Sequence, residues 1–514
     1  MFTFWVFLSS FIQAKESSVL ASGNWYKVSV QNDGVYKLSY SDLASLGVNL
    51  NNLSCSSIRI FGNGGGMLPM LNSEFRHNTI KENAISVVDK DTNGVFESED
   101  YILFFGQSPE RWNYSETDGL FHHQKHLFDN KTYYFITTDL GDGGKRIIST
   151  NNQSFDFIIT EFDDFQFHEK DLENLIKSGS QWYGERFEFN NEYNFNFSFP
   201  DRITSIPVYI KTSVVARSFS SSSFTIRENA SNIQQISVGN VLSGSTADYA
   251  KLSSQSTTFI SNSSNIDISV IYNPPQSGSV GWLNYIELNA RRHLRMTGDQ
   301  LLFRDSESVN NGLAGKFIIS NTSNNINVWD ISDPINVSHR LTSFLGGELS
   351  FIADVDTLKD YVAFKPSNFL SPELIGKIDN QDLHGNDHDV EYVIVSHPNF
   401  FSAANRLAQY HEQKNGLKTI VVTPQEIYNE FSSGTKDITA IRDFLRMFYK
   451  KPNNKLKYLL LFGDASYDPL NRITANTNYI PSFQSKNSIS PTQSYITDDF
   501  FGLLDVQLAV IQLV

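Results

Sequence analysis

Residues 89–100 carry the most specific spacing of potential metal ligands in the sequence. Oxygen-bearing side chains stand at loop positions 1, 3 and 5, and Gly94 stands at position 6 for the sharp turn. A backbone carbonyl at position 7 and carboxylates at positions 9 and 12 complete the spacing that a calcium ion requires. The predicted ligands are Asp89, Asp91, Asn93, Val95, Glu97 through a water molecule, and Asp100.

Two features of this loop keep a second interpretation open. Position 12 is Asp100, where the usual loop has Glu, and the shorter side chain is less suited to bidentate binding. The flanking segments, Val87-Val88 and Tyr101-Ile102, have the composition of strands and not of helices. We therefore expect a structural calcium clip between two strands, and the alternative is an acidic β-turn without metal.

The cysteine, the clustered histidines and a glycine-rich stretch are the other positions that could carry chemistry. Cys55 is the single cysteine, which excludes an intrachain disulfide and a cysteine-rich zinc site, and its surroundings predict a half-buried small apolar residue. His122, His123 and His126 have a spacing that occasionally holds zinc, but their polar context predicts exposed loop histidines. The glycines of residues 62–66 predict a tight turn, because no helix and no Lys-Ser/Thr pair follows them.

Three continuous apolar segments near the end of the chain predict strands buried on both faces of a parallel sheet. They cover residues 392–396, 419–423 and 458–462. Ligands bind beyond the carboxyl ends of such strands, so His397, Thr423 and Asp464 are candidate site positions. Asp464 fits two roles equally well: it orients a base or substrate, or it caps the following turn.

Helical patterns alternate with these strands. Phe401, Ala404, Leu407 and Ala408 share one face of a segment that Asn415-Gly416 closes. A second apolar stripe follows Asp437 and ends near Pro452; it consists of Ile438, Ile441, Phe444, Leu445 and Phe448. The order strand, helix, strand, helix, strand predicts an α/β domain with a parallel sheet over residues 390–514.

The rest of the chain has the pattern of β structure. Short aromatic and β-branched segments between Asn, Asp and Gly predict an antiparallel β domain over residues 15–150. Longer alternating segments with Ser-rich turns predict a β-sandwich over residues 151–382. The polar stretch 379–389 is typical of a linker, so we expect few contacts across it and independent folding of the region before it.

Length and charge limit the functional classes. A chain of 514 residues has room for about three domains, and a hydrophobic content of 40% excludes overall disorder. The net charge is -15, without a dense basic run, so we expect no nucleic-acid partner.

The first residues have the length of a secretory signal. Residues 2–12 form an apolar run that is too short for a membrane span, and residues 1–14 are interpreted as a signal peptide. No Lys or Arg precedes the run, which leaves a plain apolar N-terminus as the alternative. We expect an exported protein.

Several separated motifs carry a family resemblance. The later segments resemble the first half of a gingipain-family cysteine peptidase domain, which is caspase-like; they are Tyr392-Val-Ile-Val-Ser396, residues 415–422, residues 438–444, Tyr458-Leu-Leu-Leu-Phe-Gly-Asp464 and residues 497–502. Earlier segments resemble the long N-terminal region of PorU-type sortases of the type IX secretion system; they are residues 60–68, 179–185 and 281–287.

This resemblance implies a cysteine endopeptidase at the cell surface, associated with the outer membrane. Such an enzyme cleaves C-terminal sorting signals from secreted cargo proteins and works with outer-membrane secretion components. The resemblance also implies a His general base and a Cys nucleophile, both downstream of the matched segments. No catalytic residue is therefore assigned in this chain.

Residues 506–514 form an apolar stretch without a closing turn. Together with the missing His and Cys, this predicts a truncated gene product or a shifted reading frame, and a chain that is inactive alone. The alternative function is a noncatalytic β-rich adhesion or binding module of the cell surface with a vestigial α/β domain.

Overall fold

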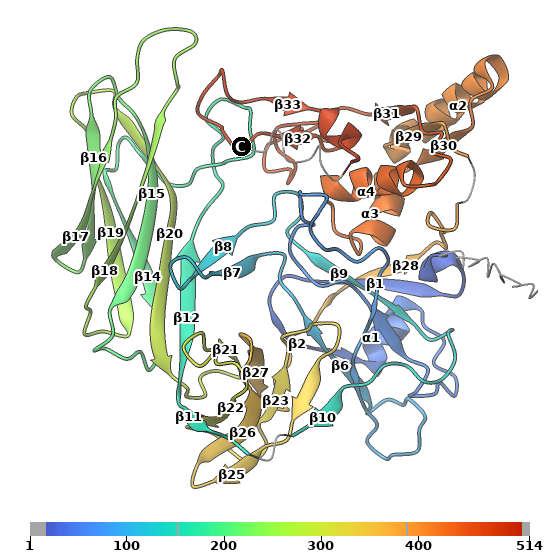
Figure 1. Cartoon of the computed structure of the whole chain (residues 1–514), viewed down its shortest axis with the longest axis horizontal. Coiled ribbons are helices and arrows are strands. Elements are labelled where there is room, and N and C mark those ends of the chain that lie inside the picture. Colours follow the sequence, from blue (N-terminus) through green and yellow to red (C-terminus); the bar gives the residue numbers. More distant parts are fainter. Residues whose placement is uncertain (1–16, 152–153, 387–388, 506–514) are drawn as a thin grey trace, which may run out of the picture.

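A computed structural model describes residues 17–151, 154–386 and 389–505. The interpreted signal peptide, residues 1–14, and the apolar stretch 506–514 lie outside the described residues. Strands dominate most of the chain, and the longer helices gather in its last quarter (Figure 1). The predicted fold class, β-rich domains followed by an α/β region with a parallel sheet, is confirmed.

The N-terminal region packs two antiparallel sheets and one short helix around a shared core. The larger sheet has the order β28 (Glu373–Ile378), β1 (Trp25–Val30), β9 (Thr132–Thr137), β3 (Arg59–Phe61) and β4 (Glu82–Asn83). The smaller sheet has the order β2 (Gly34–Ser39), β6 (Tyr101–Gly106) and β5 (Ser86–Val88), and α1 (Tyr40–Leu46) follows β2. Ser39 and Asp42 form a capping box that starts α1, and Gly47 ends it with a φ of 87°.

A ten-stranded sheet runs through the middle of the molecule. Its order is β10 (Ile148–Thr150), β24 (Ser338–Arg340), β23 (Asn327–Asp330), β27 (Asp360–Phe364), β21 (Gln300–Arg304), β12 (Glu161–His168), β20 (Val280–His293), β15 (Val208–Arg217) and β18 (Lys251–Phe259), with β13 (Arg186–Phe187) paired to β20. β20 is 14 residues long and pairs with β12, β13 and β15. This strand therefore connects the sandwich at one end of the sheet to the strands at the other end.

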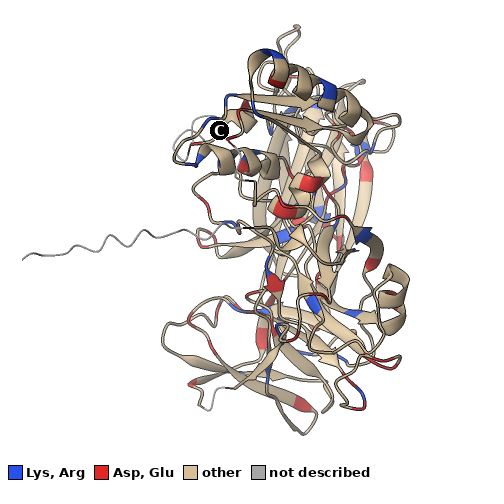
Figure 2. Cartoon of the chain, turned by 90° about the vertical axis from the view of Figure 1, so that its right-hand side faces the viewer, with Lys and Arg blue, Asp and Glu red and all other residues tan. Residues whose placement is uncertain are grey.

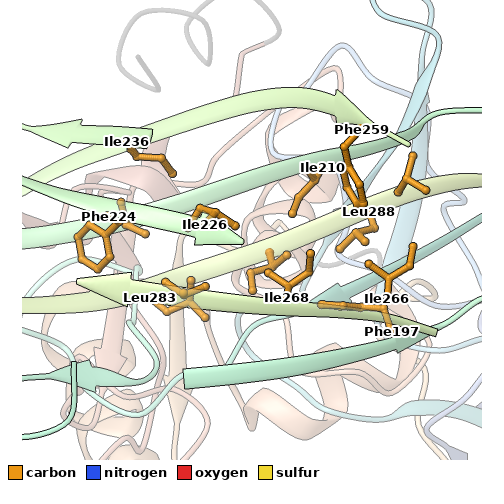
Figure 3. Close-up of a cluster of buried hydrophobic side chains, with 14 of the residues drawn as sticks. Phe197, Ile210, Phe224, Ile226, Ile236, Phe259, Ile266, Ile268, Leu283 and Leu288 are labelled. Carbon is orange, nitrogen blue, oxygen red and sulfur yellow. The ribbon is translucent and has the colours of Figure 1, made fainter. Parts of the chain in front are cut away.

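Two four-stranded sheets pack on this large sheet. The first forms the sandwich with β15, β18 and β20, and its order is β14 (Glu192–Ser198), β19 (Asn265–Asn273), β16 (Ser222–Glu228) and β17 (Ser231–Val238). Figure 3 shows its core, where Phe224, Ile268 and Leu283 interlock between the layers. The second has the order β11 (Phe157–Ile159), β22 (Ala314–Ile319), β26 (Glu348–Asp354) and β25 (Ser343–Leu345). The alternating sequence pattern explains both, because every second residue faces a core.

The two β regions share strands. β28, which lies at the end of the predicted sandwich region 151–382, pairs with β1 through partners such as Trp25 and Ile378. β10, which ends the N-terminal region, pairs in parallel with β24. The boundaries near residues 150 and 382 are therefore places where the chain crosses between sheets.

The α/β region contains a parallel sheet of three strands in the order β30 (Thr419–Val422), β29 (Tyr392–Ser396) and β31 (Tyr458–Phe462). The predicted helices are present as α2 (Phe401–Asn415), which Gly416 ends with a φ of 66°, and α4 (Ile438–Tyr449), which Asp437 caps. A third helix, α3 (Pro424–Phe431), was not predicted, although Thr423 and Glu426 form a capping box and proline stands in the first turn. Short 3-10 turns are η1 (Val19–Ala21), η2 (Pro398–Phe400) and η3 (Asp499–Gly502).

Two small hairpins lie between these regions. The first joins β7 (Arg111–Ser115) to β8 (Leu120–Gln124), and the second pairs β32 (Phe483–Gln484) with β33 (Ile496–Thr497). In the part of the chain that the structure describes, no helix is long and apolar enough to cross a membrane. Acidic and basic residues are scattered over both the β-rich and the helical parts of the chain (Figure 2).

The expectation of few contacts across the linker is wrong. Gln381 binds Glu426 and Glu430 of α3, and Asn380 binds Leu20 and Gly23. The N-terminal region also contacts the α/β region directly, because the segment 67–76 lies along α4 and hydrogen bonds to it. The polar composition of residues 379–389 predicted that their side chains face solvent. Instead, Gln381 and Asn380 donate to backbone carbonyls and to the buried Glu430 carboxylate.

Three buried cations lie at this junction. Lys27 of β1 donates to Asn429 Oδ1 (3.2 Å) and to the Gly434 carbonyl (3.1 Å), and its ammonium lies 4.0 Å from the Tyr133 ring. Arg442 donates to the Met70 carbonyl (2.5 Å), and Arg446 donates to the Asn72 carbonyl (3.2 Å). Burial lowers the pKa of Lys27 to about 7.

Lys27→Met should flatten the pH dependence of stability above pH 7. Between about pH 7 and 10.5 the unfolded chain keeps the Lys27 proton that the native chain has lost, so native stability rises with pH. The rise is at most about 1.4 kcal/mol per pH unit. Urea unfolding at several pH values measures the slope, with exposed Lys377→Met as the matched control. Equal slopes in the wild type and Lys27→Met would contradict this assignment.

Candidate functional site

The carboxyl edge of the parallel sheet is the first candidate site, because β29, β30 and β31 all end there. His397 follows β29, its Nδ1 accepts the Asn399 N–H, and its ring centroid lies 4.7 Å from that of Tyr479. Tyr479 also donates its backbone N–H to the carbonyl of Asp464, which follows β31. The structure therefore brings His397 and Asp464 to the same tyrosine.

The other predicted positions at this edge have structural roles. Ser396 is fully buried, and its hydroxyl donates to the His397 carbonyl (3.1 Å). Thr423 caps α3, since its hydroxyl accepts the Glu426 N–H and its N–H donates to the Glu426 carboxylate. Asp464 has an exposed side chain, so the edge offers an imidazole and a carboxylate to solvent. An imidazole and a carboxylate are groups that can bind or position a substrate, but neither is a thiol or hydroxyl nucleophile.

Cys55 is not part of this edge. Its half-buried side chain packs against the core of the N-terminal sheets, and its N–H donates to the Gly94 carbonyl (2.9 Å). Burial, followed by the carboxylates of Asp89 and Asp100, raises the pKa of its thiol to about 11. The only thiol of the chain is therefore held in its unreactive form, as the sequence analysis expected.

The loop 89–100 has the turn geometry of its sequence motif. Asp89 Oδ2 accepts the Gly94 N–H (2.7 Å), Asp91 Oδ1 accepts the Asn93 N–H (3.2 Å), and Asn93 Oδ1 accepts the Val95 N–H (2.7 Å). Gly94 has a φ of 84° at the sharp turn. The Gly94 N–H, ahead of the other contacts, holds the pKa of Asp89 below its usual range.

The fit of this loop to calcium is partial. Asp89 Oδ1 is buried and has no partner among the described residues, so one carboxylate oxygen remains open to a cation. Asp100 is buried, and its two oxygens accept the N–H groups of Lys90 (2.8 Å) and Glu97 (2.7 Å), which brace the loop. Within the described ranges, no three His, Cys, Asp or Glu side chains form a group that could hold a metal. A cation here would also need Asn93 and backbone carbonyls.

A buried histidine–carboxylate cluster replaces the expected exposed histidines. Glu287 of β20 is 2% exposed in its side chain and contacts Nδ1 of His122 (2.7 Å) and Nδ1 of His123 (2.6 Å). His123 Nε2 contacts Glu169 (2.7 Å). Burial opposes a charge on His123, but its hydrogen bonds to Glu169 and Glu287 outweigh burial and raise its pKa. Only the fold brings Glu287 to these histidines, so local sequence held no signal for the cluster.

Cys55 should react slowly with iodoacetamide in the native chain. Its pKa near 11, against a usual value of 9.0, lowers the thiolate fraction at about pH 8 by roughly 100-fold. Mass spectrometry follows the alkylation of Cys55 over time. The ratio of its rate in concentrated urea to its rate in the native chain measures this protection. Equal native and unfolded rates would show that the thiol is accessible and ionised.

Comparisons with known proteins agree with this architecture. Residues 386–513 match the model of the family described as Peptidase family C25. The crystal structure of dimeric latent PorU from Porphyromonas gingivalis matches 96% of this chain at 26% identity, with a TM-score of 0.80. The match covers 46% of the PorU chain, so this chain spans less than half the length of that protein. No curated protein matches the chain in sequence.

A second solved structure matches part of the chain. The insecticidal delta-endotoxin Cry8Ea1 from Bacillus thuringiensis is 13% identical, with coverage of 47% of this chain and 43% of its own, and has a TM-score of 0.17. Residues 386–513 thus match Peptidase family C25, and the chain shares the fold of PorU over nearly its whole length, as the resemblance to gingipain-family peptidases and PorU-type sortases implied.

Proposed function

We propose that the protein is a cysteine peptidase of the type IX secretion system that removes C-terminal sorting signals from secreted cargo at the cell surface. The observation that carries this proposal is the PorU fold over 96% of the chain, combined with the C25 segment. The partners are then cargo proteins with C-terminal sorting domains and secretion components of the outer membrane. The protein would be exported and associated with that membrane.

The geometry supports a positioning role for these 514 residues. The parallel sheet presents His397 and Asp464 at its carboxyl edge, where a substrate binds in α/β folds. The buried cations Lys27, Arg442 and Arg446 fix this sheet against the β-rich region. Nucleophilic catalysis needs a thiolate within hydrogen-bond reach of a base. The Cys55 thiol has a pKa raised to about 11, and it packs against the core of the N-terminal sheets, away from the edge of the parallel sheet. We infer that this chain alone cleaves no peptide bond.

Deletion of the gene should leave cargo unprocessed. Secreted proteins with C-terminal sorting domains are expected to keep those domains in the deletion strain, and mass spectrometry of the secreted fraction detects the extra mass. The purified 514-residue chain, incubated with the same cargo, should leave its mass unchanged. Normal cargo processing in the deletion strain would contradict the proposed function.

We also propose that the loop 89–100 binds calcium with Asp89, Asp91 and Asn93 as side-chain ligands and the Val95 carbonyl and Glu97, through water, as further ligands. The unpartnered Asp89 Oδ1 and the turn that aligns the first three side chains support the proposal. Asp100 then acts as a brace of the loop, because both of its oxygens accept backbone N–H groups. The ion would be a structural clip between β5 and β6.

Calcium should raise the melting temperature of the chain, and Asp89→Ala should abolish the rise. A Kd of roughly 10⁻⁴ to 10⁻³ M is expected for an extracellular site. Calcium at ten times the Kd then adds about 1.4 kcal/mol of stability. Differential scanning calorimetry measures the shift, with exposed Asp379→Ala as the control that keeps it. An unchanged melting temperature at millimolar calcium would favour the metal-free β-turn.

A further inference from the structure

A cavity of about 480 Å³ opens where three parts of the chain meet. Its walls come mainly from β8 and the residues after it, from the pair β15 and β20 with the loop 169–182, and from the loops around β32. His397, Asp464 and Tyr479 do not line it, so the cavity is separate from the carboxyl edge of the parallel sheet. Its volume is in the range of small-ligand sites.

One face of the strand pair β15 and β20 forms a wall of this cavity. Side chains alternate between the two faces of a strand. Ile210 and Ile286 belong to the sandwich core, so Lys211, Tyr285 and Glu287 lie on the opposite face. On that face the Glu287 carboxylate contacts two histidines of β8, which also line the cavity. The side chains of Lys211 and Tyr285 therefore stand on the cavity side of the sheet.

Lys211 and Tyr285 are close neighbours on this face. In the antiparallel ladder, Lys211 lies opposite Glu287, and Ser213 lies opposite Tyr285. Lys211 and Tyr285 are therefore diagonal neighbours, a separation of about 7 to 8 Å that long and aromatic side chains can span. One small ligand can thus reach the ammonium and the phenol together.

Both side chains end in donors that the fold leaves free. Among the described residues, neither the Lys211 ammonium nor the Tyr285 hydroxyl has a hydrogen bond or an ion pair. Both residues are half-buried, and their polar atoms are open to solvent. Burial, followed by the carboxylates of Glu287 and Glu169, raises the pKa of Tyr285, so its hydroxyl keeps its proton and can donate.

The acidic groups of the wall already have partners. Asp171 pairs with Lys125 (2.7 Å) and with Arg472 (2.8 Å). Glu169 and Glu287 both contact histidines of β8, at distances of 2.6 to 2.7 Å. Each carboxylate of the wall is therefore engaged, whereas the half-buried ammonium on β15 has no counterion in the described part of the chain.

These donors define the charge of a suitable ligand. A half-buried ammonium without a counterion favours an anion, and the phenol hydroxyl adds a second donor to it. Glu287 lies directly opposite Lys211 in the ladder, so its negative charge repels a dianion such as phosphate more than a monoanion. A single carboxylate matches the single free ammonium.

The rest of the wall includes a cluster of apolar side chains. Met67, Met70, Phe128 and Phe483 line the cavity. Flexible methionine side chains and aromatic rings suit an aliphatic group, because methionine adapts to irregular shapes. A carboxylate that carries a short aliphatic group therefore fits both parts of the wall.

We propose that this cavity binds a small monovalent carboxylate with an aliphatic group, and that the Lys211 ammonium and the Tyr285 hydroxyl hold the carboxylate. The aliphatic group lies against the methionine and phenylalanine side chains. The carboxylate is the end of a peptide or of an acyl chain, which share this chemistry. The site is separate from the proposed peptidase function, and binding there requires no catalysis.

The test is calorimetric titration of the full chain at neutral pH, where carboxylates are ionised. N-acetylleucine represents a peptide end and hexanoate an acyl chain, and the tighter of the two identifies the source. Saturable binding is expected. N-acetylleucinamide, which differs from N-acetylleucine by the loss of the charge, should bind at least about tenfold more weakly.

Two variants remove the proposed donors one at a time. The affinity for the tighter carboxylate should fall at least about tenfold in Lys211→Met and about threefold or more in Tyr285→Phe. Met keeps most of the lysine stem and Phe keeps the ring, so both variants should fold, and melting temperatures verify this. Lys377→Met on β28 and Tyr410→Phe on α2 do not touch the cavity and are the matched controls that keep wild-type affinity.

Several outcomes would overturn the proposal. Absence of saturable binding by both carboxylates, or equal affinity for N-acetylleucine and its amide, would remove the carboxylate site. Unchanged affinity in Lys211→Met would place the carboxylate elsewhere on the protein. Inorganic phosphate that binds more tightly than either carboxylate and displaces it would assign the cavity to phosphate instead. None of these outcomes depends on whether the protein cleaves cargo.

Discussion

The burial of cations against backbone carbonyls is the constraint on which the arrangement of the molecule depends. Lys27, Arg442 and Arg446 come from the two regions that face each other, and each ends on a carbonyl of the opposite region. A cation removed from water is costly unless its donors are satisfied, so a displaced region would leave uncompensated charge. Two donors of Arg442, Nε and Nη1, still lack partners in the described residues, although its guanidinium lies 4.2 Å from the Phe500 ring. The junction thus fixes the two regions relative to each other, while the unpartnered donors of Arg442 lower the stability of the folded chain.

This junction also sets the orientation of the parallel sheet and of the loops near it. The parallel sheet is held with its carboxyl edge toward Tyr479, while the segment that follows β8 lies against the loops around β32. Backbone bonds from Ser180 to Ser485 (2.9 Å) and from Tyr249 to Ile489 (2.7 Å) attach the sandwich to the same loops. A separate β-rich module on a flexible linker would leave the orientation of the sheet edge undefined. The contacts across the linker therefore favour one working unit of β-rich and α/β parts.

Local patterns predicted the elements but not their partners. The apolar runs of β29 and β31, the stripe of α4 and the Gly416 stop located these elements because period and caps are local properties. The expected burial on both faces holds for β29 but is wrong for β30 and β31, which are mostly half-buried because they are the outer strands of the described three-stranded sheet. α3 was missed because it lies between two stronger signals, although its capping box was visible in the sequence. The sequence did not predict that strands near the boundaries at residues 150 and 382 pair with the neighbouring region. β28 and β1 are far apart in sequence, and their pairing depends on the whole fold. At the candidate site, Thr423 and Asp464 could be located but not assigned a role, because a capping hydroxyl and a ligand-binding hydroxyl occur in the same sequence context.

The histidines of one short segment show why a role requires the partners as well as the residue type. His123 and His126 are three positions apart and both are buried, yet carboxylates raise the pKa of one and burial lowers the pKa of the other to about 3. His123 uses both ring nitrogens within the fold, on Glu169 and Glu287, so its role is structural. His126 uses only Nδ1, which accepts two backbone N–H groups, and its Nε2 is buried without a partner among the described residues. The partners that the fold supplies, and not the histidine spacing, therefore decide how each ring ionises.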